Sequence, residues 1–218
     1  MIEILSIHLP KTGGSSLFQT LKNIYGEENV KFYNREIYLD IKNQGKDITD
    51  DISENHKVVH GHLYYREVKK LIKTHNPRII TWLRDPVERV VSNYYWWQHD
   101  LRRKENHPAK DRINEPIEVY ITRKETQNKM YRFLKGISLK DIFFFGFLET
   151  LNQDIMELAS AMKWENIQFF HEKNSSGFEK KKESISEKVR QKIIALNTKD
   201  IKLYNEVLRM KGRDIVKF

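Results

Sequence analysis

A loop rich in glycine and hydroxyl side chains follows the first strand-like run of the chain. Residues 10–16 read PKTGGSS, and a helical pattern begins directly after them. Glycines let a backbone approach a ligand closely, and the start of a helix presents N–H groups with a partial positive charge. Lys11 adds a mobile cation. Hydroxyl donors come from Thr12, Ser15 and Ser16. This composition predicts a site for an anion of phosphate type, with an ordinary strand-to-helix turn as the alternative.

The order of residues in the loop disfavours ATP or GTP as the ligand. A Walker A loop carries its lysine after the glycines, whereas Lys11 precedes the glycine pair here. Phosphoryl transfer also uses acidic side chains that hold Mg²⁺. Asp85 follows a predicted strand, but Arg84 and Arg89 flank it, so we interpret it as an arginine partner. We therefore predict no metal site.

A second stretch with the composition of an anion site is ITWLRDPVERVVSNYYWW, residues 80–97. Arg84 ends a strand-like run, and Asp85-Pro86 begins a helix with proline at a favoured first position. Ser92 lies on that helix, eight residues after Arg84. Because guanidinium binds oxyanions in a fork, Arg84 and Ser92 are candidates for a second phosphate. The alternative is a surface cluster of ion pairs.

Two histidines provide a candidate base. His60 and His62 end the strand-like run 57–62, and strand alternation places both on the same side. Imidazole has a pKa near 6.5, which suits proton transfer at neutral pH. A structural histidine is the alternative for either one. His8 ends the first strand, and we expect it to have a supporting role at most.

Alternating strand and helix patterns surround these segments. We predict strands at 2–8, 57–62, 78–83, 141–149 and 166–171. We predict helices at 15–25, 65–74, from about 87, 150–163, from a capping box of Ser184 and Glu187 to about 196, and 199–211. This alternation predicts one α/β domain over residues 1–218, with a parallel sheet and helices on both faces. Ligands bind such sheets at the carboxyl ends of the strands, so the functional loops should be 9–16, 60–66 and 84–92.

The composition narrows the class of protein. The 218 residues are 39% hydrophobic and 32% charged, which is typical of a soluble globular chain. No apolar run approaches the roughly 18 residues that span a bilayer. The absence of cysteine excludes disulfides and thiolate metal sites, and we expect a cytoplasmic protein. The net charge of +9 favours an anionic partner or a solvated lysine-rich surface.

The motifs together resemble a known family. HLPKTGGSSL (8–17) looks like the 5′-phosphosulfate loop of sulfotransferases that use 3′-phosphoadenosine 5′-phosphosulfate (PAPS), and LRDPVERVVSNYY (83–95) looks like their 3′-phosphate motif. VVHGHLYY (58–65) is similar to the His-Gly-His segment of heparan and uronyl 2-O-sulfotransferases. Weaker similarities to the same carbohydrate-type enzymes follow in order at 125–136, 144–159, 170–176 and 196–207.

The resemblance implies a P-loop-NTPase-like three-layer fold and in-line sulfuryl transfer from PAPS to an acceptor hydroxyl, with 3′,5′-adenosine bisphosphate (PAP) as product and no metal. It assigns the donor to Lys11, Thr12, Gly13, Gly14, Ser15, Ser16, Arg84, Ser92 and Lys181. Lys11 would stabilise the leaving oxygen, the loop would hold the 5′-phosphate, and Arg84 with Ser92 would hold the 3′-phosphate. His62 would be the base, with His60 as its helper. The acceptor would be a carbohydrate or else a small-molecule alcohol or amine.

Further candidates and rival functions stay open at this stage. The aromatic run 94–100 fits helix packing or an acceptor cover, and the basic segment 101–116 fits a lid or a solvated loop. Asn128 and Arg132 are expected on a helix that faces donor or acceptor, and the run 180–182 is a loop that could close over the nucleotide. The rival functions are a nucleotide kinase of related fold and a basic nucleic-acid-binding module. We expect no specific nucleic acid and no membrane span, and self-association into a homo-oligomer stays open.

Overall fold

The computed structural model describes residues 1–165, 167 and 185–218, which divide into two compact units. Unit 1 contains Met1–Leu83 and the chain from Arg132 to the end of helix α7; unit 2 contains Arg84–Tyr131 and the C-terminal helices. The single domain over 1–218 stays a prediction. In the part of the chain that is described, no helix is long and apolar enough to cross a membrane.

Unit 1 is built on a five-stranded sheet in the order β2-β3-β1-β4-β5, in which every pair is parallel. The strands are β1 (Ile4–Ile7), β2 (Val30–Tyr33), β3 (Val58–Gly61), β4 (Arg78–Leu83) and β5 (Phe144–Phe147). In the centre of the sheet, Ser6 of β1 lies beside His60 of β3 and Ile80 of β4. The predicted α/β architecture with a parallel sheet is confirmed.

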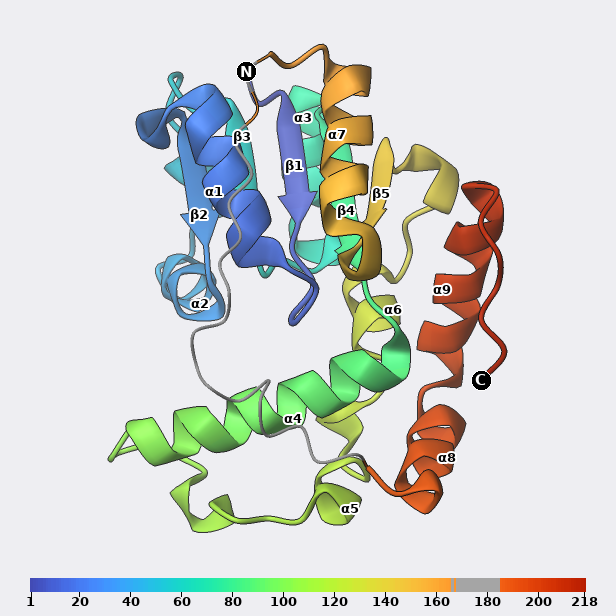
Figure 1. The fold of residues 1–218 in the computed structure, drawn as a ribbon. Coiled ribbons are helices and arrows are strands. Elements are labelled where there is room, and N and C mark those ends of the chain that lie inside the picture. The colour runs from blue at the N-terminus through green and yellow to red at the C-terminus, as the bar shows by residue number, and fades with distance from the viewer. Residues whose placement is uncertain (166, 168–184) are drawn as a thin grey trace. The chain divides into compact units, whose positions relative to one another are not determined.

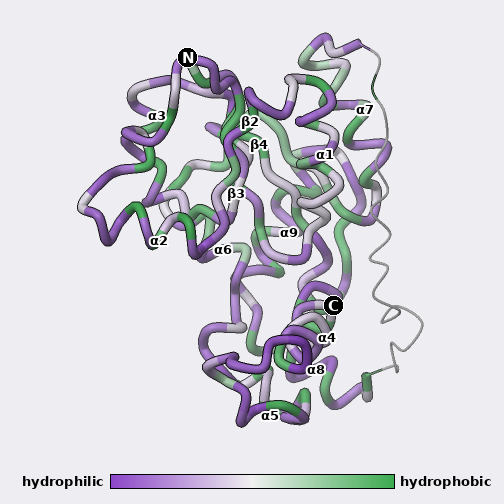
Figure 2. Tube along the Cα trace, turned by 90° about the vertical axis from the view of Figure 1, so that its left-hand side faces the viewer, coloured by the Kyte–Doolittle hydropathy of each residue, from purple (hydrophilic) through white to green (hydrophobic). Residues whose placement is uncertain are grey.

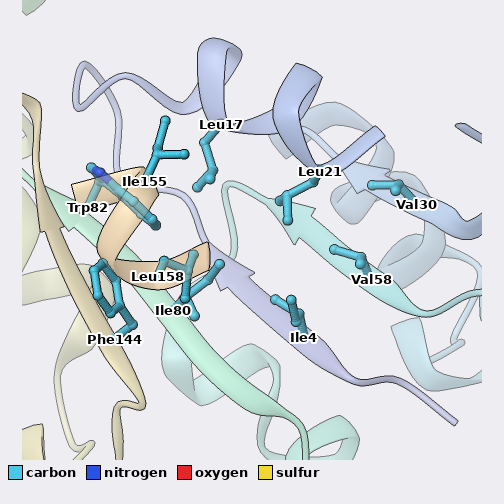
Figure 3. Packing of buried hydrophobic residues seen from close by; sticks show 10 residues of the cluster. All are labelled: Ile4, Leu17, Leu21, Val30, Val58, Ile80, Trp82, Phe144, Ile155 and Leu158. Atoms are coloured by element: carbon cyan, nitrogen blue, oxygen red, sulfur yellow. The ribbon is translucent and has the colours of Figure 1, made fainter. Parts of the chain in front are cut away.

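Helices cover both faces of this sheet, so unit 1 has three layers. Helices α1 (Gly14–Tyr25) and α7 (Leu151–Met162) lie on one face, and α3 (Lys69–His75) lies on the other (Figure 1). Along α1 and α7 hydrophilic and hydrophobic residues alternate (Figure 2), as expected for helices that bury one side. Leu17 and Leu21 of α1 meet the strands in a buried cluster that α7 completes with Ile155 and Leu158 (Figure 3).

Two more helices of the chain complete this region: α2 (Arg35–Asn43) follows β2, and α6 (Lys129–Leu134) runs across the division between the units. Asn34 caps α2 by accepting a hydrogen bond from the backbone of Ile37 at 2.8 Å. Neither β2 nor α2 was predicted from the sequence. Strand β2 reads VKFY, and four residues that mix a lysine with apolar side chains give too weak a pattern.

Unit 2 is helical in its described part, with α4 (Pro86–Arg103), α5 (Ile117–Tyr120), α8 (Glu187–Leu196) and α9 (Thr198–Met210). Val87, Val90 and Val91 of α4 pack against α5 and α8. Beneath them, the buried guanidinium of Arg89 lies 3.7 Å from the carboxylate of Asp200 in α9 and donates to the carbonyl of Thr126 at 3.1 Å. This charged pair fixes α4 to α9 inside unit 2.

Most predicted elements are confirmed within a few residues. The predicted strand 166–171 falls outside the described residues, apart from residue 167, which is in no strand. Ser184, which the sequence pairs with Glu187 in a capping box, lies outside the described residues. Helix α8 begins at Glu187, and the cap is Ser186, whose hydroxyl accepts from the backbone N–H of Val189 at 3.3 Å.

Candidate active site

The loop between β1 and α1 has an unusual backbone conformation. Lys11 and Gly13 both have positive φ angles, of 70° and 84°. A positive φ is uncommon for a residue with a side chain, and it is adopted here in a tight turn. Thr12 is buried, and its hydroxyl donates to the carbonyl of Leu9 at 2.8 Å. Thr12 therefore closes the turn with its side chain, and only its backbone N–H remains to bind an anion.

The start of α1 lacks the side-chain cap that many helices have. Its N-cap residue is Gly13, which offers no side-chain acceptor, and the first turn carries no acidic residue. The first N–H groups of a helix need acceptors, and a bound anion can supply them. Ser15 is exposed at this helix start, whereas Ser16 is buried. The predicted loop residues thus surround a helix start that suits a phosphate-type group.

Gly14 lets a histidine ring lie against this helix start. A Cβ atom on Gly14 would lie 1.9 Å from Nε2 of His8, so no larger residue fits while the ring stays there. The backbone N–H of His8 donates to the carbonyl of Gly61 at 2.9 Å, which joins the ends of β1 and β3. His8 therefore links the phosphate-type loop to the His-Gly-His segment.

Three histidines of unit 1, His8, His60 and His62, form one stack. The His8 ring centroid lies 4.2 Å from that of His62 and 5.0 Å from that of His60. Both predicted histidines thus contact the same ring, as strand alternation leads one to expect. The glycine between them is required, because a Cβ on Gly61 would lie 2.1 Å from the carbonyl oxygen of Tyr33 in β2.

His62 has the orientation and tautomer of a base. Its Nδ1 lies 2.9 Å from the carbonyl oxygen of His8. A carbonyl only accepts, so Nδ1 carries the proton, and in the neutral imidazole the lone pair is then on Nε2. The side chain is half-buried. The geometry allows His62 to accept a proton at Nε2 beside the phosphate-type loop.

His60 is enclosed more completely than His62. It is 1% exposed, and its Nδ1 is hydrogen-bonded to the hydroxyl of Ser6 at 2.8 Å. Its Nε2 is buried without a hydrogen-bond partner among the described residues. Burial, followed by the nearby His62, lowers the pKa of His60 to about 3. His60 therefore stays neutral at physiological pH, and its ring stacks on those of His8 and Phe18.

His8 is also held neutral. Burial lowers the pKa of His8 well below its ordinary value, and the charges that His60, His62 and Lys11 can carry lower it further. Its Nδ1 is buried without a hydrogen-bond partner in the described part of the chain. A cation on His8 would be desolvated and would lie close to other cations, so this ring contributes packing rather than charge.

The second predicted anion motif lies at the start of α4 in unit 2. Asp85 is the N-cap of α4, where its Oδ1 accepts from the N–H groups of Val87 at 2.8 Å and Glu88 at 3.0 Å. Asp85 thus has a capping role that the sequence analysis did not foresee. The guanidinium of Arg84 lies 3.7 Å from the carboxylate of Glu88, and Ser92 is half-buried on the same helix. Arg84 follows the last residue of β4 directly.

Asn128 does not lie on a helix, which corrects the prediction that it would face donor or acceptor from one. Its side chain instead holds parts of unit 2 together. It precedes α6 and has a positive φ of 48°. Its Oδ1 accepts from the N–H groups of Lys199 at 2.8 Å and Asp200 at 3.2 Å, and its Nδ2 donates to Leu196 at 3.1 Å. Asn128 therefore joins α8 to α9. Arg132 lies on α6 as predicted.

The aromatic run on α4 packs within unit 2. Tyr94 donates to the carbonyl of Glu115 at 2.8 Å, and the rings of Tyr94 and Trp97 each lie 5.2 Å from that of Tyr120. Trp96 is half exposed. In the basic segment 101–116, Lys110 donates to the carbonyl of Leu101 at 2.7 Å, so this segment is tied back to α4. The run 180–182, with the predicted Lys181, lies outside the described residues.

One polar pair next to the histidines was missed. Nη1 of Arg35 donates to Oε2 of Glu67 at 2.7 Å and lies 3.5 Å from the carbonyl oxygen of His62. The two residues are 32 positions apart, and no local pattern connects them. The pair could have been expected only if β2 had been recognised as the strand next to β3. Arg35 follows the end of β2 and His62 follows the end of β3, so parallel pairing of the two strands brings the residues close together. The described residues contain no cluster of three or more histidine and acidic side chains that could hold a metal ion.

Comparisons with known proteins agree on one family. The model of the sulfotransferase family matches residues 2–205. A mouse sulfotransferase, SULT7A1, complexed with PAP shares 15% identity with a TM-score of 0.50, over 98% of this chain and 84% of the other. A sulfotransferase from Alicyclobacillus acidocaldarius shares 12% identity with a TM-score of 0.53, over 98% of this chain and 97% of the other. No curated protein sequence matches. At these identities the two structures support the fold.

Proposed function

Because the chain belongs to the sulfotransferase family, we propose that it transfers a sulfuryl group from PAPS to a hydroxyl group of a carbohydrate. The family match extends over residues 2–205 and therefore includes every predicted site residue. It favours a sulfotransferase over the two rival functions, a nucleotide kinase and a nucleic-acid-binding module.

The observation that carries this proposal is the contact between the candidate base and the phosphate-type loop. His62 is held by the carbonyl of His8, and the His8 ring lies against Gly14 at the start of α1. Sulfuryl transfer needs a proton acceptor next to the group that is transferred. In unit 1 a single residue, His8, brings the two together.

The loop fits the phosphosulfate end of PAPS. The uncapped start of α1 and the left-handed turn at Gly13 present N–H groups to an anion, and Ser15 adds an exposed hydroxyl. In this proposal, residues 12–16 hold the 5′-phosphate, and Lys11 offsets the negative charge that collects on the oxygen leaving with the nucleotide. PAPS supplies the sulfuryl group when it is bound.

Arg84 and Ser92 are assigned to the 3′-phosphate of the donor. Arg84 presents a guanidinium 3.7 Å from the carboxylate of Glu88, and Ser92 adds a hydroxyl on helix α4, which begins two residues after Arg84. A guanidinium binds a phosphate through two parallel hydrogen bonds. The PAP bound to the mouse relative supports a donor of this chemistry. Lys181 remains assigned to the nucleotide by resemblance.

His62 acts on the acceptor. As the acceptor oxygen forms its bond to sulfur, His62 takes the hydroxyl proton at Nε2, and the electron pair of the broken bond stays on the oxygen of the departing nucleotide. The bond from Nδ1 to the His8 carbonyl fixes the ring and stabilises the imidazolium that forms. His60 is a positioning residue, because it is 1% exposed and its Nδ1 is hydrogen-bonded to the hydroxyl of Ser6.

Steady-state kinetics of the His62→Gln variant test this assignment. We expect kcat for PAPS-dependent sulfation to fall by about 10²–10⁴, the usual contribution of a general base, while the Kd of PAP stays within a factor of two or so. His56→Gln, which removes a histidine from a turn outside the stack, is the matched control and should keep wild-type kcat. Loss of PAP affinity with unchanged kcat would contradict the role of His62.

The acceptor class is tested with a panel of oligosaccharides, small alcohols and amines, with PAP release as the readout. We expect turnover with oligosaccharides. Turnover with the small alcohols or amines alone would overturn the carbohydrate assignment and leave the donor assignment in place.

A further inference from the structure

An ion pair joins the start of helix α2 to the segment after β3, close to His62. Oε2 of Glu67 accepts from Nη1 of Arg35 at 2.7 Å and from the backbone N–H of Tyr64 at 2.9 Å. The Glu67 side chain is 7% exposed, and that of Arg35 is 36% exposed. An enclosed carboxylate with two donors holds a more defined geometry than a pair of fully exposed side chains. Glu67 therefore fixes the segment that follows β2 to the segment that follows β3.

The backbone of His62 is held from the same edge of the sheet. Its N–H donates to the carbonyl of Tyr33, the last residue of β2, at 2.9 Å. Its carbonyl oxygen lies 3.5 Å from Nη1 of Arg35, two residues further along the chain. Strand β3 itself ends at Gly61. Arg35 therefore continues the contact between the two strands past the residue at which β3 ends.

An aromatic pair lies against the ring of His62. The Phe133 ring centroid is 6.5 Å from that of His62, and the two planes are 75° apart, so the rings meet edge to face. Phe133 is 2% exposed, and Tyr64 stacks on it with a centroid distance of 4.2 Å. The guanidinium groups of Arg35 and Arg66 lie over the Tyr64 ring, at 5.0 and 5.3 Å from its centroid. Arg35 thus reaches the ring of His62 through two aromatic side chains as well as through the backbone.

The orientation of the His62 ring decides which nitrogen can accept a proton. Nδ1 lies 2.9 Å from the carbonyl oxygen of His8, which leaves Nε2 for the acceptor hydroxyl. Rotation of the ring would break this bond and move Nε2. Because His62 is half-buried and follows the end of β3, the ladder of the sheet does not fix its side chain. A displacement of about 1 Å in a reacting group can lower a rate about 100-fold, so contacts that limit this rotation affect catalysis.

We propose that Arg35 and Glu67 are positioning residues for His62. Their ion pair holds the segment after β3 and the aromatic pair in the arrangement that keeps Nδ1 of the histidine on its backbone carbonyl. Because the two opposite charges are 2.7 Å apart, they largely cancel at the imidazole, and the pair acts through geometry. This inference rests on the proposed function, because it assumes that His62 is the base.

Steady-state kinetics separate positioning from contact with the acceptor. We expect Arg35→Met and Glu67→Met each to lower kcat about tenfold, within the loss that a displacement below 1 Å causes, while the acceptor KM and the Kd of PAP stay within a factor of about two. Glu67→Gln keeps an acceptor oxygen for both donors and should retain most of the wild-type kcat. Unchanged kcat in Arg35→Met would overturn the proposal. A raised KM with unchanged kcat would overturn it too, since the guanidinium would then contact the acceptor.

Two further variants separate positioning from a general loss of structure. Lys31→Met removes another ion pair of β2, in which Nζ lies 2.9 Å from a carboxylate oxygen of Asp51, and it should keep the wild-type kcat. Arg35→Met combined with Glu67→Met should be no slower than either single variant, because the pair acts as one unit. A tenfold loss in Lys31→Met, or losses that multiply in the double variant, would assign the effect to destabilisation of unit 1 and refute the positioning role.

The tautomer of His62 is a readout that does not depend on turnover. Nitrogen-15 NMR of the imidazole distinguishes a proton on Nδ1 from one on Nε2, and it is recorded on the full chain with PAP at pH 8, where a histidine of ordinary pKa is neutral. We expect the Nδ1–H form in the wild type and in Lys31→Met. Arg35→Met should give a mixture of both forms, because the ring leaves the His8 carbonyl in part of the molecules. A pure Nδ1–H form in Arg35→Met would overturn the proposal.

The two readouts distinguish this inference from the proposed function. A tautomer change in Arg35→Met, without PAPS turnover by the wild type on any acceptor, would overturn the proposed function and leave the ring-positioning role supported. Wild-type turnover that Arg35→Met leaves unchanged, together with an unchanged tautomer, would overturn the positioning role alone.

Discussion

Mild acid is expected to destabilise the protein through His60. This histidine is 1% exposed, and burial lowers its pKa from 6.5 to about 3. The unfolded chain binds a proton at this residue below pH 6.5, whereas the folded chain does not until about pH 3. The stabilisation is therefore complete above pH 6.5 and is lost progressively as the pH falls from 6.5 to 3.

The size of the effect follows from the separation of the two pKa values. At pH 5, about 1.5 units below the ordinary histidine pKa of 6.5, the unfolded chain is protonated at His60 and the folded chain is not. This difference lowers the free energy of unfolding by about 2 kcal/mol. His8 adds to the loss in the same direction, because burial lowers its pKa as well. The His60→Gln variant removes one titrating group, and the difference in unfolding free energy between pH 7 and pH 5 should therefore be about 2 kcal/mol smaller than in the wild type.

Urea unfolding at the two pH values provides the measurement. Ile80→Val, a buried change on strand β4 of the same sheet, is the control: it should lower the unfolding free energy by about 1 kcal/mol at both pH values and keep the wild-type difference. If the His60→Gln variant kept the full wild-type difference in unfolding free energy between pH 7 and pH 5, the inference that His60 is enclosed and neutral in the folded protein would be refuted.

Three further perturbations have defined outcomes. Lys11→Ala should reduce kcat for sulfation at least about 100-fold with an unchanged circular dichroism spectrum, because it removes the cation beside the leaving oxygen; near-wild-type turnover would exclude that role. Gly14→Ala should cost about 1–3 kcal/mol in urea unfolding and also lower kcat, since the new methyl group displaces the His8 ring; a neutral effect on both would contradict this contact. Arg89→Ala should cost about 3–5 kcal/mol, because it leaves the buried carboxylate of Asp200 unpaired, whereas Arg89→Met combined with Asp200→Asn should cost less; equal losses would mean that the pair contributes through packing alone.

The sequence was sufficient to predict the strands and helices that a run of neighbouring residues identifies. Strand β4 was predicted at its observed bounds, because six residues with five buried side chains make an unambiguous apolar run. Helix α1 was equally clear from the spacing of Leu17 and Leu21. Strand β2 is an edge strand with two half-buried residues, so neither alternation nor continuous hydrophobicity reveals it.

The site depends on contacts that no local pattern contains. The loop and the His-Gly-His segment were found from the sequence, but the role of His8 comes from β1 and β3 being neighbours in the sheet. The same pairing sets His60 beside Ser6, 54 positions away. Asn128 shows the converse error: a polar residue in a family-like segment was assigned to ligand contact, whereas its amide satisfies the ends of α8 and α9.

We expect this sulfotransferase to bind a 3′-phosphorylated nucleotide through its two anion motifs. The most direct measurement is the melting temperature of the full chain at fixed salt with PAP, compared with 5′-ADP plus Mg²⁺. A ligand that binds only the folded state raises that temperature. We expect an increase with PAP and little or none with ADP and Mg²⁺. An increase with ADP and Mg²⁺ and none with PAP would contradict the assignment of Arg84 and Ser92 and the choice of donor.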